Sequence, residues 1–188
     1  MKGFTLWFTG LPGAGKSLLA RELEGSLLER GMKVELLDGN DARRFLSPEL
    51  GSAADDSDVH VRRLGYLCHV LTQNDVVAIA TTTSPGRASR EENRGRIGRF
   101  VEVYCRCDPQ TLEGSGAAGE RGDDGGDYEA PEKPEVIIDR GAETVAESAA
   151  RVIRTLELLG YISKSPDTDY SDDDERQISD RLEDLGYL

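Results

Sequence analysis

Gly10-Leu-Pro-Gly-Ala-Gly-Lys16-Ser17 directly follows the apolar run 4–8 and precedes leucines that recur at helical spacing. A strand, a G-x-x-x-x-G-K-[ST] loop and a helix in this order are the pattern of a phosphate-binding loop (P-loop). Its glycines let the backbone turn tightly enough to aim consecutive N–H groups at phosphate oxygens, and the start of the helix adds partial positive charge. A glycine-rich turn of another βα unit is the alternative, but the complete match in this context predicts nucleotide binding.

Each position of the loop has an expected role. Lys16 should reach the β- and γ-phosphates, and the Ser17 hydroxyl should hold Mg²⁺. The residues expected to contact the nucleotide are Gly10, Leu11, Pro12, Gly13, Ala14, Gly15, Lys16, Ser17 and Leu18.

The composition fits one intracellular domain. The 188 residues suffice for one α/β core, and no apolar run approaches the ~20 residues of a membrane span. Met1-Lys-Gly leads directly into the first strand-like run, so we expect a cytoplasmic protein without a membrane partner. Cys68, Cys105 and Cys107 lack the spacing of a metal site. We interpret them as buried free thiols rather than redox groups.

The net charge of −13 is concentrated in two segments. Residues 108–135 and 166–188 each hold nine acidic and two basic side chains, so each carries −7 and the other 137 residues carry +1. A near-neutral body with two acidic segments lacks the basic stripe that a nucleic-acid partner needs. We therefore expect no nucleic-acid partner, and we interpret both acidic segments as solvated.

Strand-like and helical runs alternate along the chain, which predicts an α/β fold with a doubly wound, mostly parallel, five-stranded sheet. The expected strands are 5–8, 34–37, 76–82, 100–105 and 136–138, and the expected helices are 16–30, 58–74, 88–98 and 142–159. Gly31 and Gly160 stand where the helix C-termini would fall.

The domain organisation follows from the same patterns. A P-loop domain should cover 1–165, with 108–135 as an acidic, glycine-rich lid or loop whose residues 110–127 we expect to be mobile without ligand. The tail 166–188 should contain a short helix. Ser171 with Asp174 resembles a capping box, and Ile178, Leu182 and Leu185 recur at helical spacing.

A second cluster of charged residues, Asp38-Gly-Asn40-Asp41-Ala-Arg43-Arg44, follows the second expected strand. Open α/β sheets place their ligand crevice at the carboxyl ends of strands. A carboxylate there can deprotonate a hydroxyl or hold Mg²⁺, and an arginine can bind an anionic acceptor. The same residue types also favour a simple turn, but their place after the strand favours a functional site.

Seven parts of the sequence also share a family pattern: 1–17, Leu37-Asp-Gly, Val61-Arg-Arg-Leu-Gly, Ser84-Pro-Gly-Arg87, Arg94, Val101-Glu-Val-Tyr and Tyr128-Glu-Ala-Pro-Glu-Lys-Pro-Glu135. Through residues 1–160 the chain resembles the adenylylsulfate kinases (APS kinases). The resemblance implies a P-loop fold like that of nucleoside-monophosphate kinases, with ATP and Mg²⁺ as cofactors. It further implies transfer of the ATP γ-phosphate to the 3′-hydroxyl of adenosine 5′-phosphosulfate (APS), which gives PAPS in sulfate assimilation, by a protein that is commonly a homodimer.

The resemblance also implies roles for individual residues. Lys16 and Asp38 would be the catalytic residues, with Asp38 as metal ligand or base and Ser17 as the second metal ligand. Arg43 would contact the phosphosulfate side of the acceptor. The full set of acceptor-binding candidates is Asp38, Asn40, Arg43, His60, Thr83, Ser84 and Pro85. His60 has two equally favoured interpretations, one facing the acceptor and one packed in the protein.

The chain departs from the family pattern on the acceptor side. Asn40-Asp41 replaces Asp-Asn, Ser52 stands at an aromatic position, Ser57 stands at an arginine position and Gly86 at a tyrosine position, while 108–127 is a shorter lid. Losing the aromatic and the arginine could weaken APS binding by on the order of 10² to 10⁴, and restoring both should tighten it. Three hypotheses stay open: a divergent APS kinase, a related kinase for another hydroxyl compound, and a nucleotide-binding regulatory protein without transfer.

Three arginines at helical spacing leave a further alternative. Arg87, Arg90 and Arg94 begin the expected helix 88–98 or lie within it. They could form a basic wall opposite the P-loop, and a surface ion-pair face is an alternative that is favoured almost as much.

Overall fold

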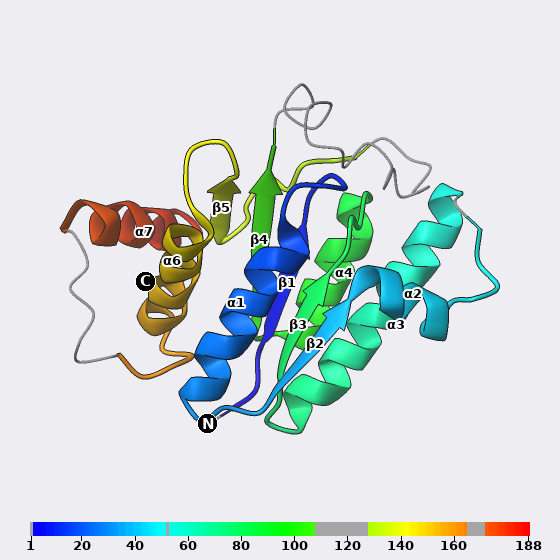
Figure 1. The fold of residues 1–188 in the computed structure, drawn as a ribbon, viewed down its shortest axis with the longest axis horizontal. Helices are drawn as coiled ribbons and strands as arrows, with labels where there is room; N and C mark the ends of the chain where they lie inside the picture. Colours follow the sequence, from blue (N-terminus) through cyan, green and yellow to red (C-terminus); the bar gives the residue numbers. More distant parts are fainter. Residues whose placement is uncertain (1, 52, 108–127, 165–171) are drawn as a thin grey trace.

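The computed structural model describes residues 2–51, 53–107, 128–164 and 172–188 and contains one five-stranded sheet (Figure 1). All neighbouring strands are parallel, in the order β2-β3-β1-β4-β5. The strands are β1 (Thr5–Thr9), β2 (Val34–Asp38), β3 (Val77–Thr81), β4 (Phe100–Arg106) and β5 (Val136–Asp139). The helices are α1 (Lys16–Glu29), α2 (Gly39–Leu46), α3 (Ala54–Gln73), α4 (Arg87–Ile97), α6 (Val145–Leu158) and α7 (Asp172–Asp184). The expected α/β fold with a doubly wound sheet is confirmed.

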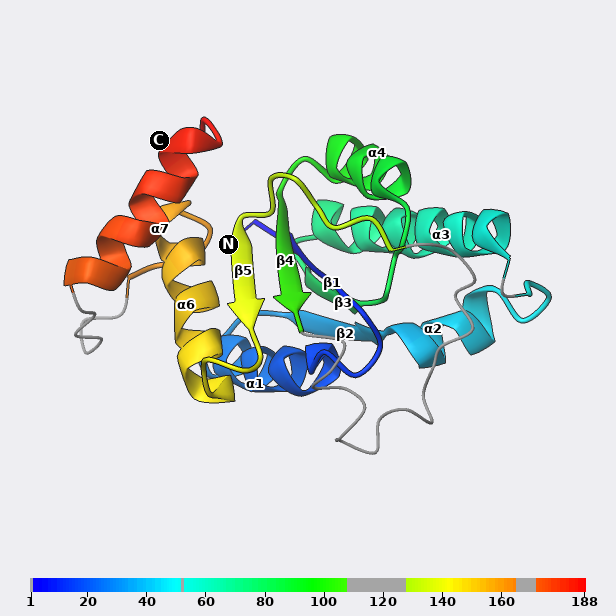
Figure 2. The same ribbon diagram turned by 90° about the horizontal axis from the view of Figure 1, so that it is seen from above.

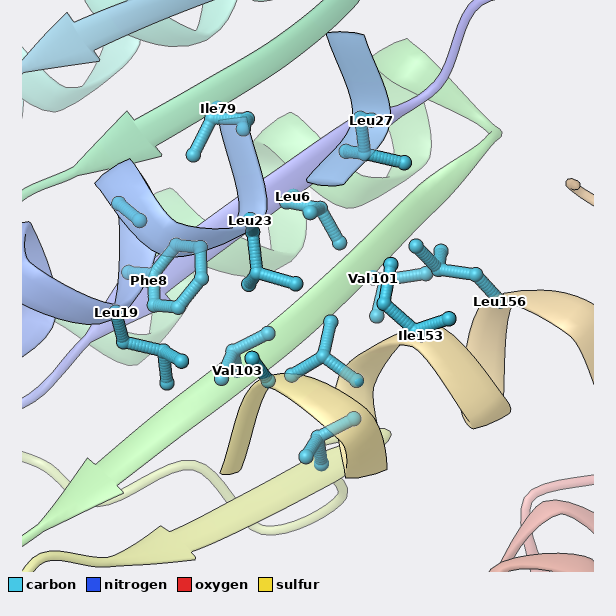
Figure 3. Close-up of a cluster of buried hydrophobic side chains, with 14 of the residues drawn as sticks. Leu6, Phe8, Leu19, Leu23, Leu27, Ile79, Val101, Val103, Ile153 and Leu156 are labelled. Atoms are coloured by element: carbon cyan, nitrogen blue, oxygen red, sulfur yellow. The ribbon is translucent and has the colours of Figure 1, made fainter. Parts of the chain in front are cut away.

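Helices cover both faces of the sheet. Seen from above, α1 and α6 lie on one side and α3 and α4 on the other (Figure 2). Side chains alternate across a strand, so on β1 Leu6 and Phe8 join the core under α1 and α6, while Trp7 joins the core under α3 and α4. Figure 3 shows the first of these cores, in which Leu23 of α1 and Ile153 of α6 pack over β1 and β4.

The central strand explains the apolar run that precedes the P-loop. β1 pairs with β3 on one side and β4 on the other, and all five of its residues are buried. A parallel strand that is covered on both faces has an almost continuous apolar sequence. The strand order reverses beside β1, which is where open α/β sheets bind their ligands.

The main difference from the expected elements is α2, which the sequence pattern predicted only as a turn or site. The Asp38 side chain accepts a hydrogen bond from the Asn40 backbone N–H at 3.1 Å and thereby caps the helix. Residues that favour turns also favour helix N-caps, so the cluster could not separate the two outcomes. Gly31 and Gly160 have the left-handed φ of 75° and 66° expected at helix C-termini.

The tail forms a helix that packs on the body, which differs from a fully solvated segment. Ile178 and Leu182 of α7 are buried, and the Arg181 Nε donates to the Pro134 carbonyl at 2.8 Å. The apolar spacing that predicted a helix is therefore also the spacing of a packed face. Ser171 of the expected capping box lies outside the described residues.

Two further expectations concern the acidic segment 108–135 and membrane-spanning helices. The expected mobility of 110–127 concerns residues that the structure does not describe. Within the described part of the chain, no helix is long and apolar enough to cross a membrane.

Candidate nucleotide and acceptor site

The loop between β1 and α1 has the backbone geometry of a phosphate cradle. Gly10, Gly13 and Gly15 have φ values of 143°, 80° and 82°, which side chains rarely adopt. A Cβ at Gly10 would lie 2.3 Å from the Cys105 carbonyl oxygen, so only glycine fits beside β4. Lys16 Nζ donates to the Gly10 and Leu11 carbonyls, at 2.8 Å each.

Two candidate metal ligands meet beside this loop. The Ser17 hydroxyl at the start of α1 donates to Asp38 Oδ2 at the end of β2, at 2.8 Å. A hydroxyl and a carboxylate are hard oxygen ligands of the kind that Mg²⁺ takes, usually together with water and substrate phosphates. This pair of donors therefore fits Mg²⁺ next to a bound nucleotide.

A close approach between backbones holds Asp38 in this place. Gly39 follows Asp38, and its N–H donates to Thr81 Oγ1 at 3.3 Å. A Cβ at Gly39 would lie 2.2 Å from the Thr81 carbonyl oxygen. The start of α2 can therefore lie against the end of β3 only because residue 39 is glycine.

The acid at position 41 does not join the metal-ligand pair. Asp41 is exposed and lies 3.6 Å from Arg44 on the same helix. Asn40 is also exposed, and its backbone N–H donates to the Asp38 side chain. The structure thus brings Asp38 to the P-loop and leaves Asp41 in a surface ion pair.

The remaining acceptor candidates on α2 and α3 contact neighbouring loop and helix groups. The Arg43 guanidinium donates to the Gly51 carbonyl, and the Gly51 N–H donates to Asp56 Oδ2 at 2.9 Å. His60 is buried, with Nδ1 3.0 Å from the Ser47 hydroxyl at the end of α2. These contacts link the end of α2 to the start of α3. The assignment of both residues to the acceptor stays a prediction.

Ser57 lies in a closely packed environment on α3. It is 2% exposed, and its hydroxyl has no hydrogen-bond partner among the described residues. An arginine here would have to displace neighbouring atoms, so the arginine position of the family pattern has been closed in this chain. Ser52, which stands at the aromatic position, lies outside the described residues.

The candidates after β3 belong to a hydrogen-bond network that sequence reasoning missed. Trp7 Nε1 donates to Ser84 Oγ at 3.2 Å, and Ser84 Oγ donates to Thr9 Oγ1 at 3.1 Å. Thr9 Oγ1 donates to the Thr83 carbonyl at 2.8 Å and accepts from the Tyr128 hydroxyl at 3.1 Å. Thr9 directly precedes the P-loop, so one hydroxyl joins the P-loop to the loop 83–85. The position of Thr9 at the end of a fully buried strand could have indicated that its side chain is buried, but not which groups it meets.

The three arginines of α4 form ion pairs rather than a basic wall facing the P-loop. Arg90 is 2% exposed, and its Nε donates to Glu102 Oε1 at 2.9 Å. Arg94 pairs with Glu102 at 3.2 Å and with Glu135, and Arg87 pairs with Glu132. Burial raises the pKa of Glu102, although Arg90 and Arg94 oppose this shift. The arginines therefore form ion pairs, but the expected surface position is wrong for part of the cluster, because Arg90, Glu102 and Glu135 are buried.

The cysteines have the character of packed thiols. Cys68 and Cys105 are buried, and burial raises the pKa of each thiol to about 12. Thiolates react and bind metals, whereas buried neutral thiols are inert. Cys107 is half-buried and, like the other two, is not in a disulfide.

Comparisons with known proteins identify the family. The family model described as adenylylsulphate kinase matches residues 2–139. The adenylyl-sulfate kinase of Halothermothrix orenii is 41% identical over 88% of this chain and 96% of its own length. A probable bifunctional SAT/APS kinase 2 of Sorangium cellulosum is 42% identical over 87% of this chain, which spans 30% of that longer protein.

A solved structure agrees with this match. The Mycobacterium tuberculosis APS kinase, solved with AMPPNP and APS, has a TM-score of 0.73 and 31% identity over 83% of this chain and 98% of its own. The family match covers the P-loop, Asp38 and the loop 83–85. On these grounds the chain belongs to the adenylylsulfate kinase family.

Proposed function

We propose that this protein is an APS kinase, which transfers the γ-phosphate of ATP to the 3′-hydroxyl of APS and releases PAPS and ADP. The contact between Ser17 and Asp38 beside the P-loop carries the proposal, because it combines a phosphate cradle with two ligands for a phosphate-bound cation. Relatives with this name and about 41% identity over almost their full length support APS as the acceptor.

Catalysis in this reaction consists mainly of positioning reactants and stabilising phosphate charge. Lys16 would exchange its bonds to the Gly10 and Leu11 carbonyls for bonds to phosphate oxygens. Ser17 and Asp38 would hold Mg²⁺, which when bound neutralises charge on the β- and γ-phosphates. The contact of Asp38 with Ser17 supports the metal role or the base role for this carboxylate.

The acceptor would lie between α2, the start of α3 and the loop 83–85. Asn40, Arg43 and His60 come from the helices, and Thr83, Ser84 and Pro85 come from the loop. The closed environment of Ser57 favours a second candidate function, in which the same machinery phosphorylates another hydroxyl compound. A third outcome is nucleotide binding without transfer.

The setting of the reaction is part of the same proposal. We infer a cytoplasmic enzyme with small-molecule substrates, in line with the family. We also infer a homodimer. The Thiobacillus denitrificans relative, 38% identical over 86% of this chain, is described as a hexameric APS kinase, which supports association in the family but not this particular state.

A panel of acceptors tests the proposal directly. The protein is incubated with Mg²⁺ and ATP labelled at the γ-phosphate, together with APS, nucleosides, sugars or small alcohols, and the labelled products are separated. We expect PAPS as the main product, and we expect a folded Lys16→Ala variant to lose transfer. Labelling of another acceptor would support the second candidate. Nucleotide binding without any labelled product would support the third.

A further inference from the structure

Helix α7 lies beyond residue 139, where the family match ends, and the short segment that follows the helix reaches a buried acid of the body. The Tyr187 hydroxyl donates to Glu135 Oε1 at 2.7 Å, and Arg181 binds the neighbouring Pro134 carbonyl. Between β5, α6 and α7 there remains a cavity of about 520 Å³. Ile178 and Leu182 pack α7 on the body, and the polar contacts at Pro134 and Glu135 add to this packing.

Glu135 is the first of four buried or half-buried charged side chains that form a line from this point into the body. It is 2% exposed and accepts from both terminal nitrogens of Arg94 and from the Glu102 backbone N–H, the last at 2.6 Å. Glu102 in turn binds Arg94 at 3.2 Å and Arg90 at 2.9 Å. Two acids and two arginines alternate, so their charges balance. In such a network each member is fixed by the others, and loss of one partner leaves a buried charge uncompensated.

The other end of this line holds the loop 83–85. Besides Glu102, Arg90 donates to the carbonyls of Ser84 and Pro85, the latter at 3.1 Å, and to the Glu129 carbonyl at 2.6 Å. Ser84 has a φ of 42°, a left-handed conformation that a residue with a side chain keeps only when its surroundings enforce it. The enforcing contacts are those with Arg90 and, through Ser84 Oγ, with Trp7 and Thr9.

We propose that α7 is a positioning element for the loop 83–85, and that it acts through Tyr187, Glu135, Arg94, Glu102 and Arg90. Tyr187 fixes one oxygen of Glu135, the alternating charges carry this constraint across β4, and Arg90 holds the loop backbone. The description of this loop as acceptor-binding rests on the proposed function, whereas the link between α7 and Ser84 does not.

Trp7 makes the link measurable without any substrate. It is the chain's one tryptophan, it is fully buried, and its Nε1 binds Ser84. In the full-length protein, Tyr187→Phe removes one hydroxyl at the far end of the line. Tyr66→Phe is the matched control, because Tyr66 is exposed on the outer side of α3. We expect Tyr187→Phe, and not Tyr66→Phe, to change the emission maximum of Trp7 and its quenching by acrylamide.

The kinetic readout separates positioning from general damage. In Tyr187→Phe the KM for APS should rise about three- to tenfold while the KM for ATP stays within about twofold, the scale of coupling through a contact network. Glu135→Gln keeps the side-chain shape and removes its charge, so it should move both readouts further in the same direction. Thermal melting establishes that each variant is folded.

Two results would overturn the proposal. One is a Trp7 signal in folded Tyr187→Phe and Glu135→Gln that equals that of the wild type. The other applies when the wild-type protein makes PAPS. It is a changed Trp7 signal in these variants together with a KM for APS that equals that of the wild type. If the wild type makes no PAPS and Trp7 still responds, the proposed function fails and the link from α7 to the loop stands.

Discussion

The two halves of the candidate site are built from different materials. The nucleotide half consists of backbone: three glycines with positive φ, the start of α1 and one side-chain pair, Ser17 with Asp38. The acceptor half consists of side-chain contacts between segments far apart in the sequence, such as Thr9 with Tyr128, which are 119 residues apart. A half made of local backbone can be found from an octapeptide, whereas a half made of long-range contacts cannot.

The largest expected effect separates the two acids near the P-loop. Asp38→Asn keeps the shape of the side chain and removes the carboxylate that contacts Ser17, so transfer to APS should fall by at least about two orders of magnitude. Asp41→Asn should change the rate little, because Asp41 is exposed and pairs with Arg44. Steady-state kcat and KM of both variants measure this.

The reverse result has a clear meaning. Full activity in Asp38→Asn together with loss in Asp41→Asn would show that Asp41 supplies the essential carboxylate. The nucleotide half would then extend into the altered Asn40-Asp41 pair rather than end at β2.

A second change tests whether the nucleotide half depends on backbone approach. Gly39→Ala places a Cβ 2.2 Å from the Thr81 carbonyl oxygen, so α2 must move away from β3 and carry Asp38 with it. We expect a loss of about 2–3 kcal/mol of unfolding free energy, as for overpacked sites, and a lower kcat. Denaturant unfolding and the kinetic assay measure the two effects.

Gly25→Ala is the matched control for this change. Gly25 lies within α1, and a Cβ there meets nothing within 4 Å. The variant should gain about 0.5–1 kcal/mol from the lower chain entropy of alanine. A Gly39→Ala protein as stable and as active as the wild type would refute the backbone account of this half.

These contrasts define what the sequence could predict. The run 4–8, the P-loop and the alternating elements predicted the central strand, the cradle and the doubly wound sheet, because periodicity and glycine positions act locally. The same patterns placed Asp38 at a strand end, and the fold carries it to Ser17.

The missed features all depend on partners distant in the sequence. Helix α2 exists because Asp38 caps it and Gly39 fits against Thr81, and the second of these conditions is a tertiary contact. The spacing of Arg90 and Arg94 left both a basic wall and, almost as favoured, a surface ion-pair face open. What decided between them was Glu102 and Glu135, which lie on β4 and next to β5.

A third change addresses the hydroxyl that joins the two halves. Thr9→Val removes one donor and two acceptor sites, and it leaves the Thr83 carbonyl, Ser84 and Tyr128 without this partner. We expect the unfolding free energy to fall by about 2 kcal/mol. The KM for APS should be higher in the variant than in the wild type.

Thr5→Val offers the same substitution on the same strand. Thr5 is also fully buried, but its hydroxyl bonds only to Thr72 Oγ1 among the described side chains, at 2.9 Å. It should cost about 1 kcal/mol and leave the KM for APS unchanged. Equal effects of the two variants on stability and KM would mean that Thr9 does not connect the halves.

The smallest expected effect concerns Ser57, which stands at an arginine position of the family pattern. Its buried hydroxyl lacks a hydrogen-bond partner among the described residues, so Ser57→Ala removes an unsatisfied polar group and should leave the unfolding free energy unchanged or raise it by up to about 1 kcal/mol. Ser47→Ala is the matched control, because the equally buried Ser47 hydroxyl bonds to His60, and its loss should destabilise by about 1 kcal/mol.

Denaturant unfolding compares the two variants, and the KM for APS adds a second reading. If Ser57→Ala is as destabilising as Ser47→Ala, the hydroxyl is paired in solution. If Ser57→Ala leaves the unfolding free energy unchanged but raises the KM for APS, the Ser57 hydroxyl binds the acceptor. A serine then makes a contact with the acceptor at the arginine position of the family pattern.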